Sequence, residues 1–174
     1  MLPSYVNAEQ RYDELRKSAL KSFENSFSES EKGILKARTI TTEALHASTA
    51  WDTVNTRRVG WDWVNEYSAF KFRHPKRFEM ALWQNDKLIS LSLGRPTYAG
   101  TALRLDLVEA SPKELGDRVN VITFVLASLE IYARVLEARQ IRIMHPINET
   151  VRDYYASFGY TYTPKGDYLY QELL

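Results

Sequence analysis

The side chains best suited to chemistry lie near the C-terminus, between Ile141 and Tyr160. Asn148 is a good helix N-cap, and Gly159 can end a helix in the left-handed conformation. Tyr154 and Tyr155 lie between them and carry phenols, which donate a hydrogen bond while staying neutral near pH 7. The spacing predicts a short helix after a buried strand. On the residues alone, packing of either tyrosine against a sheet is the simpler interpretation.

Other reactive residue types narrow the chemistry further. The chain has no Cys, which excludes disulfides, thiolate nucleophiles and Cys-based zinc sites. The three His residues lack metal-ligand spacing, so no metal site is expected. His145 precedes Pro146 at a strand end, where it could act as a base or contact a substrate. A hydrogen bond that stabilises the turn is the alternative for His145.

These residues must be positioned by one domain, because 174 residues with 44% hydrophobic content predict a single globular core. Periodicity and turn residues predict an alternating order of helices and strands. The expected helices cover about 8–28, 42–54, 61–72, 118–138 and 148–158, and the expected strands cover about 34–41, 78–84, 88–93, 103–108, 141–144, 160–163 and 168–173.

The strand over 103–108 and the long helix after it decide the topology. Leu103, Leu105 and Leu107 alternate with polar residues, which predicts that the three leucines share one face. The helix over 118–138 has an apolar surface wide enough to be buried on more than one side. A strand, helix and strand in succession predict a parallel strand pair inside an otherwise antiparallel sheet.

This element order, together with Asn148, Tyr155 and Gly159-Tyr160 at their spacing, resembles the GNAT (Gcn5-related) N-acetyltransferases. The resemblance covers about residues 34–174. It implies an α/β (α+β) fold with a mixed, mostly antiparallel sheet flanked by helices. We expect residues 1–32 to form a helical extension packed on a GNAT-like domain over 33–174.

The resemblance also implies a reaction, in which a primary amine attacks the thioester of acetyl-CoA directly in a ternary complex. Backbone amides around Leu107, Val108 and Glu109 would orient the acetyl carbonyl and pantetheine arm, and Asn148 would lie near that arm. Tyr155 would be the general acid that protonates the leaving thiolate. Glu109 is the best candidate for the general base. Asp106 is the second candidate, and either carboxylate could simply be solvated or paired with Arg104.

In this family the pyrophosphate binds to the loop before the long helix, written Gln/Arg-x-x-Gly-x-Gly/Ala. Gly116 falls at the first glycine here, but Arg118 replaces the second small residue, and Glu114 adds a carboxylate. This departure leaves open a catalytically inactive GNAT-fold binding or interaction module, with Asp117 serving only as a helix cap. For the enzyme, the loop residues expected to hold the cofactor are Lys113, Gly116, Asp117, Arg118 and Val119.

The net charge of the chain limits which classes of partner we expect. A formal net charge of +1 gives no electrostatic reason to expect nucleic-acid or membrane binding, and no apolar stretch is long enough to cross a bilayer. We therefore expect a cytoplasmic protein whose acceptor is a small-molecule or peptide amine. The pair Arg57-Arg58 and the run Trp61-Asp62-Trp63 could form an acceptor wall, although core packing is the simpler interpretation for the tryptophans. The terminal strands or the first helix could form a homodimer interface.

Overall fold

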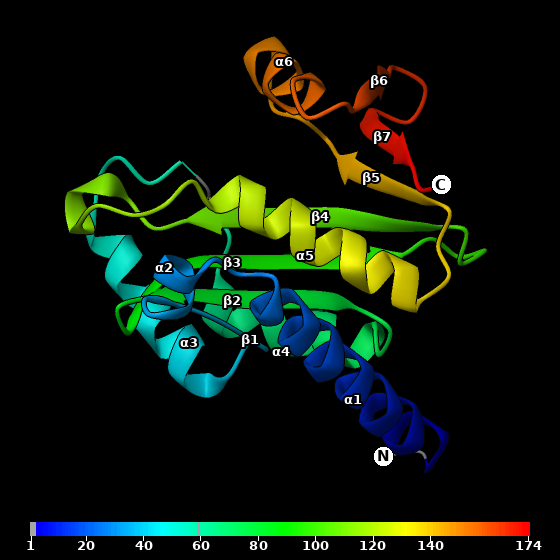
Figure 1. Cartoon of the computed structure of the whole chain (residues 1–174), viewed down its shortest axis with the longest axis horizontal. Coiled ribbons are helices and arrows are strands. Elements are labelled where there is room, and N and C mark those ends of the chain that lie inside the picture. Colours follow the sequence, from blue (N-terminus) through cyan, green and yellow to red (C-terminus); the bar gives the residue numbers. More distant parts are fainter. Residues whose placement is uncertain (1–2, 59) are drawn as a thin grey trace.

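The computed structural model describes residues 3–58 and 60–174, and these residues contain one seven-stranded sheet (Figure 1). The strand order is β1-β2-β3-β4-β5-β7-β6. Every neighbouring pair is antiparallel except β4 and β5, which run parallel as expected for a strand–helix–strand unit. The strands are β1 (Leu35–Arg38), β2 (Phe78–Gln84), β3 (Lys87–Pro96), β4 (Ala102–Ala110), β5 (Gln140–Met144), β6 (Thr161–Thr163) and β7 (Tyr168–Glu172).

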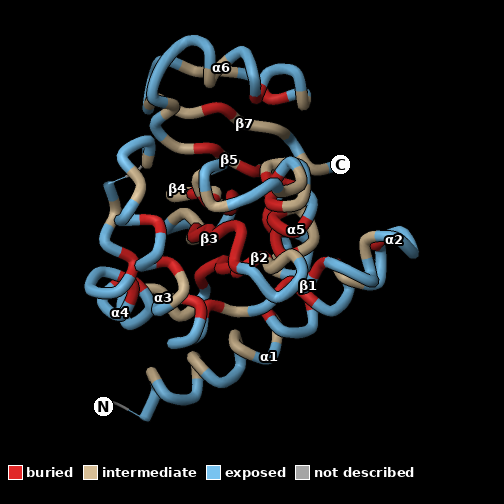
Figure 2. The backbone as a smooth tube through the Cα atoms, turned by 90° about the vertical axis from the view of Figure 1, so that its left-hand side faces the viewer, coloured by how far each residue is buried: buried red, intermediate tan, exposed pale blue. Residues whose placement is uncertain are grey.

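Helices cover both faces of the sheet, which confirms the mixed α/β architecture. Figure 2 shows buried backbone in the central strands, with α3 and α4 on one side and α5 on the other. One core cluster joins α1 and α5 to the sheet, and a second joins α3 and α4 to the opposite face. The helical elements are α1 (Pro3–Asn25), α2 (Glu29–Lys32), α3 (Thr42–Ser48), the 3-10 helix η1 (Thr49–Thr53), α4 (Trp63–Arg73), the 3-10 helix η2 (Lys113–Leu115), α5 (Val121–Val135) and α6 (Glu149–Ala156).

Several helix boundaries differ from the expected ones for local reasons. Ser28 forms a capping box with Glu31 and starts the separate helix α2, so the first predicted helix ends at Asn25. Asp62 accepts a hydrogen bond from the Asn65 amide, so α4 begins at Trp63 and not at residue 61. None of the described helices is both long and apolar enough to span a bilayer.

A bulge in β4 shows that the prediction of one common face for the three leucines of this strand was wrong. Leu93 pairs with Leu107 and Gly94 with Leu105, so Asp106 is an extra residue between them. Leu105 therefore packs in the α5-side core, whereas Leu107 turns to the α4 side. Gly94 is required at this point, because a Cβ there would overlap the Arg104 carbonyl oxygen.

Candidate active site

The free edge of β4 is the centre of the candidate site. The parallel ladder between β4 and β5 ends where Leu105 pairs with Ile143, yet β4 continues to Ala110. Among the described residues, no strand pairs with the β5-facing edge over residues 106–110. Backbone N–H and C=O groups along this edge can bind an extended ligand by adding a strand-like partner. Leu107, Val108 and Glu109, which were expected to orient a thioester, all lie on this segment.

Tyr155 is placed by α6, which begins after Asn148 and is followed by Gly159 in the left-handed region (φ 90°). Its side chain is only 5% exposed and joins the α5-side core. The ring lies 5.7 Å from that of Tyr154 and 6.4 Å from that of Tyr160, measured between centroids. Burial raises the pKa of the Tyr155 phenol to about 12. The phenol is therefore a neutral hydrogen-bond donor over the whole physiological pH range.

Tyr154 and Asn148 have structural contacts that explain their positions. The Tyr154 hydroxyl lies 3.2 Å from the side-chain oxygen of Asn120, the N-cap of α5, so it joins α6 to the start of that helix. Asn148 accepts a hydrogen bond of 2.9 Å from the Val151 amide and caps α6. The cap was the alternative to contact with the pantetheine arm, and that contact stays a prediction.

The expected phosphate loop is longer than the residue pattern indicated. The helix α5 begins at Val121 instead of about residue 118, so Arg118 and Val119 belong to the loop. Asp117 lies three residues before the N-cap and does not cap the helix, contrary to the alternative given for it. Gly116 has φ 129°, a conformation that disfavours other residues. The loop is longer because the N-cap of α5, the last residue with extended backbone, is Asn120 and not Asp117.

Two side chains of the β2–β3 hairpin hold this loop, and no pattern in the sequence pointed to them. Gln84 accepts a hydrogen bond of 2.9 Å from the Val119 amide, and Lys87 donates one of 2.7 Å to the Leu115 carbonyl. Arg118 donates from Nε to the Ser111 carbonyl at 2.8 Å, and burial lowers the pKa of its guanidinium. The loop is thus fixed by side chains that bind its backbone.

A cationic cavity of about 270 Å³ lies beside the loop. Lys113 and Arg118 line it from the loop, and Arg57 and Arg58 line it from the segment before α4, with Glu114 as the opposing charge. Arg57 is already paired with Asp52 and Glu109, so Lys113, Arg118 and Arg58 are the cationic side chains that favour an anionic ligand here. Arg57 and Arg58 thus lie beside the expected phosphate loop, and Arg57 also lines a cavity with Trp61, so the acceptor wall expected of this pair stays a prediction.

Glu109 is buried and engaged in an ion pair. Its carboxylate is 2.6 Å from Arg57 Nε and 3.1 Å from the second guanidinium nitrogen, and it accepts a 2.5 Å hydrogen bond from the Trp63 indole. The hydrogen bonds to Glu109 raise the pKa of Arg57 above its usual range, against the opposing effect of burial. Three donors occupy the carboxylate that was expected to act as the base, which favours a positioning role.

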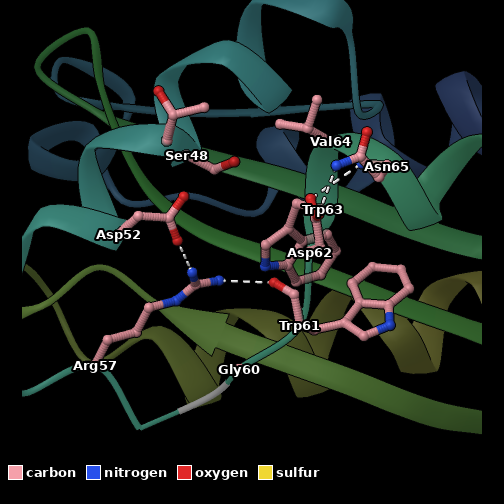
Figure 3. Close-up of a pocket in the computed structure, with 10 residues that line it drawn as sticks. Ser48, Asp52, Arg57, Gly60, Trp61, Asp62, Trp63, Val64 and Asn65 are labelled. Atoms are coloured by element: carbon pink, nitrogen blue, oxygen red, sulfur yellow. Dashed lines mark hydrogen bonds and ion pairs between the residues drawn. The ribbon is translucent and has the colours of Figure 1, made fainter.

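Arg57 extends this contact to η1 and to the segment before α4. It pairs with Asp52 and donates a 2.8 Å hydrogen bond to the Trp61 carbonyl (Figure 3). The indole of Trp61 meets Trp63 edge-on, with ring centroids 4.7 Å apart. Trp61 lines two cavities of about 420 Å³ each, one toward α3 and the other between α4 and β4. Trp61 is half-buried and forms a wall common to both cavities, whereas Trp63 belongs to the core.

The remaining candidates have structural partners. Asp106 is paired with Arg104, one of the alternatives left open. His145 has φ 51°, and its amide and ring both contact Asp167, as expected for a turn-stabilising residue. Within residues 3–58 and 60–174, no three His, Asp or Glu side chains are grouped to hold a metal ion.

The sequence matches no protein-family model and no curated protein, so the comparisons rest on solved structures. The fold is similar to Ard1 from Thermoplasma volcanium, with a TM-score of 0.61 and 11% identity over 80% of this chain and 98% of that one. It is also similar to the GNAT domain of S. lividans PAT, with a TM-score of 0.59 and 15% identity over 80% and 90%.

A third structure, the PaiA N-acetyltransferase from Thermoplasma acidophilum, was solved in complex with coenzyme A. It has a TM-score of 0.52 and 13% identity, and the match covers 80% of this chain and 99% of that one. At these identities the similarity concerns the fold. The chain therefore has the fold of the GNAT N-acetyltransferases.

Proposed function

We propose that this protein transfers an acetyl group from acetyl-CoA to a primary amine. The observation that carries the proposal is the free edge of β4 over residues 106–110, which lies in the strand that leads into the phosphate loop. An extended thioester arm can pair with that edge. Lys113, Arg118 and Arg58 give the cationic cavity the positive charge that phosphate groups need.

The reaction is a single displacement. The amine nitrogen attacks the thioester carbon, the new C–N bond forms, and the C–S bond breaks to release a thiolate. Tyr155 donates its phenolic proton to that thiolate, the attacking nitrogen loses one proton to water, and the Tyr155 phenolate takes a proton back from water. Backbone amides of residues 107–109 stabilise the oxyanion that develops on the carbonyl oxygen. The raised pKa of Tyr155 keeps the proton on the phenol until the thiolate forms.

We assign Glu109 to positioning and not to proton transfer. Its three donors leave little room for an incoming ammonium, and its bond to Arg57 fixes the backbone of Trp61. Asn148 and the loop residues Gly116, Asp117 and Val119 keep their proposed places near the cofactor. The side chains of Lys113 and Arg118 supply the charge for the phosphates, in place of the missing second glycine.

A specific observation favours the second candidate, a binding module without acyl transfer. The Val119 amide, one of the loop N–H groups available to a phosphate, is already bonded to Gln84. A GNAT-shaped module that binds another ligand would keep the same fold. Only cofactor binding and turnover separate the two candidates.

The test is the melting temperature of the purified protein with and without acetyl-CoA. A ligand that binds only the native state at about 100 times its Kd adds about 2.7 kcal/mol, which raises Tm by several degrees in a domain of this size. Replacing Lys113 and Arg118 by Gln should remove most of that rise. An unchanged Tm at about 1 mM acetyl-CoA would reject the enzyme. If acetyl-CoA raises Tm but no tested amine causes release of the CoA thiol, the binding module is favoured.

A further inference from the structure

One of the two cavities beside Trp61 lies between α4 and the bulged part of β4. Its volume is about 420 Å³, and Leu107 lines it directly from the strand segment that has the free edge. Trp61 and Phe70 give it apolar walls, and Arg73, Arg95 and Asp106 give it charge. An acceptor held here would have its amine close to the β4 edge.

The lining of this cavity carries two guanidinium groups, those of Arg73 and Arg95, and two carboxylates, those of Glu66 and Asp106. Arg73 donates from Nε to the Ala69 carbonyl within its own helix, and it has no ion-pair partner among the described residues. The only carboxylate paired with Arg95 among the described residues is Asp106, at 3.7 Å, and that carboxylate is also hydrogen-bonded to Arg104. Glu66 is the other carboxylate in the lining, and it is exposed. The exposed guanidinium of Arg73 therefore has no carboxylate partner among the described residues, and Arg95 shares the single Asp106 carboxylate with Arg104, which leaves positive charge for a ligand anion.

His74 fixes one of those guanidinium groups without adding charge. Arg95 lies 2.8 Å from His74 Nε2, and a guanidinium can only donate, so this nitrogen is the unprotonated acceptor. Burial lowers the pKa of the His74 imidazole, and so do Arg95, Arg73 and Arg104, while Asp106 alone raises it. Three guanidinium groups, those of Arg95, Arg73 and Arg104, thus lie near His74, with Asp106 as the carboxylate beside them.

We propose that this cavity binds a carboxylate of the acceptor, so that the acetylated amine belongs to an amino acid or a similar small carboxylate-bearing amine. The inference rests on the proposed function and adds the class of substrate. Guanidinium groups match the planar carboxylate with paired N–H donors. Asp106 and Glu66 in the same lining would repel a phosphate dianion more strongly than a carboxylate monoanion. Trp61, Phe70 and Leu107 contact the carbon chain.

The test compares each acid with its own carboxamide, which keeps the amine and removes only the negative charge. The probes are L-phenylalanine, L-methionine and 4-aminobutyrate with their amides, titrated calorimetrically into the protein and then used as acceptors for acetyl-CoA. We expect at least one acid to bind tenfold or more tightly than its amide, as for hydrogen bonds to charged groups. Arg95→Gln and Arg73→Gln should reduce that ratio to below about threefold, and Arg95→Lys should retain part of it.

Arg134→Gln is the matched control, because it removes one exposed guanidinium from α5 on the opposite face. It should leave the acid-to-amide ratio unchanged. Equal binding of acids and amides, an unchanged ratio in Arg95→Gln and Arg73→Gln, or no binding of any of the three acids would overturn the proposal. Acid-selective binding without acetyl transfer would reject the acetyltransferase but keep the carboxylate site. Equal acetyl transfer to acids and amides would reject the carboxylate site but keep the acetyltransferase.

Discussion

The carboxylate of Glu109 on β4 accepts two hydrogen bonds from the guanidinium of Arg57, at 2.6 and 3.1 Å. The two residues are 52 positions apart in the chain, and the Glu109 side chain is only 3% exposed. Arg57 also holds the carbonyl of Trp61. One buried ion pair therefore connects the strand that carries the proposed thioester site to the segment that lines the proposed acceptor cavities.

Glu109→Gln should lower both stability and acceptor binding. Breaking a largely buried pair by removing one charge costs about 3 kcal/mol, because Arg57 is left without its main partner. The loss is measured by urea unfolding. If Glu109 acts only by positioning, the KM for the acceptor should rise while kcat stays within about fivefold of the parent.

The matched variant is Arg57→Met, which removes the other partner. A double-mutant cycle should give a coupling free energy of about 1–3 kcal/mol between the two residues. Turnover that is about 100-fold slower or worse in Glu109→Gln, with loss of the acid limb of the pH–rate profile, would contradict this assignment and restore Glu109 as the general base.

Tyr155→Phe should slow acetyl transfer by about 100-fold while leaving acetyl-CoA affinity almost unchanged, because only the proton donor is lost. Single-turnover rates and calorimetric binding measure the two effects separately. Tyr154→Phe is the control, since its hydroxyl contacts Asn120 and has no proposed chemical role. Equal turnover in Tyr155→Phe and the parent would remove this residue from the mechanism.

Much of the fold could be predicted from the sequence, because the signals are local. The turn residues between β2 and β3, the wide apolar surface of α5, and the cap residues Asn148 and Gly159 act through neighbouring positions. The face of Leu107 was predicted wrongly, because the bulge at Asp106 depends on how β3 and β4 pair and not on the alternation within β4.

The candidate site was less predictable, because its contacts join distant segments. Glu109, Leu107 and Lys113 were identified as candidates through the resemblance, but the pairing of Glu109 with Arg57 spans 52 positions and has no local pattern. Gln84 was likewise missed, since nothing in its strand indicates that its amide binds the Val119 N–H. Pairing across distant segments depends on tertiary packing, which periodicity does not encode.

Buried tyrosines should make the protein lose stability in alkali. The pKa values of Tyr132 and Tyr155 are raised by burial to about 12, from a usual value near 10. Between about pH 10 and pH 12 the unfolded chain has lost these protons while the folded protein keeps them, so the free energy of unfolding falls as pH rises. A two-unit shift corresponds to roughly 2–3 kcal/mol for each tyrosine.

The measurement is urea unfolding at a series of pH values from about 9 to 12. The contribution is complete below about pH 10 and lost as the pH passes the folded pKa. Tyr155→Phe should show a shallower decline than the parent, whereas a variant of the fully exposed Tyr98, Tyr98→Phe, should not. Identical slopes in the parent and Tyr155→Phe would show that the phenol does not titrate as described.

Gly94→Ala should destabilise the fold by more than about 3 kcal/mol, because the new methyl group would overlap the Arg104 carbonyl and force β3 and β4 apart at the bulge. Thermal unfolding measures the loss. Gly33→Ala is the control, since a Cβ there makes an ordinary 3.7 Å contact and the backbone has φ −73°. That variant should be neutral or more stable by up to about 1 kcal/mol. Equal Tm values for the two variants would mean that the close strand approach is not required.

The N-terminal helix should be inseparable from the rest of the chain, although residues 1–32 are predicted to be an extension. Arg16 on α1 is 2% exposed and lies 3.4 Å from Glu79 on β2, while Glu9 accepts hydrogen bonds of 2.8 and 2.9 Å from the buried Arg77. Two arginines and two glutamates thus neutralise one another at the junction of the helix and the sheet.

Arg16→Met should cost about 3–5 kcal/mol, because it leaves Glu79 and Glu9 with an unbalanced charge in a buried position. Lys17→Met is the matched control, since Lys17 is 64% exposed and its pair with Asp13 contributes at most about 1 kcal/mol. A chain that begins at Gly33 would also lose the buried side chains Leu20 and Phe23 and should not fold cooperatively. Because α1 shares the core with α5, its removal should expose the apolar face of α5. Cooperative unfolding of the shortened chain at the parent Tm would contradict this and show that α1 is dispensable.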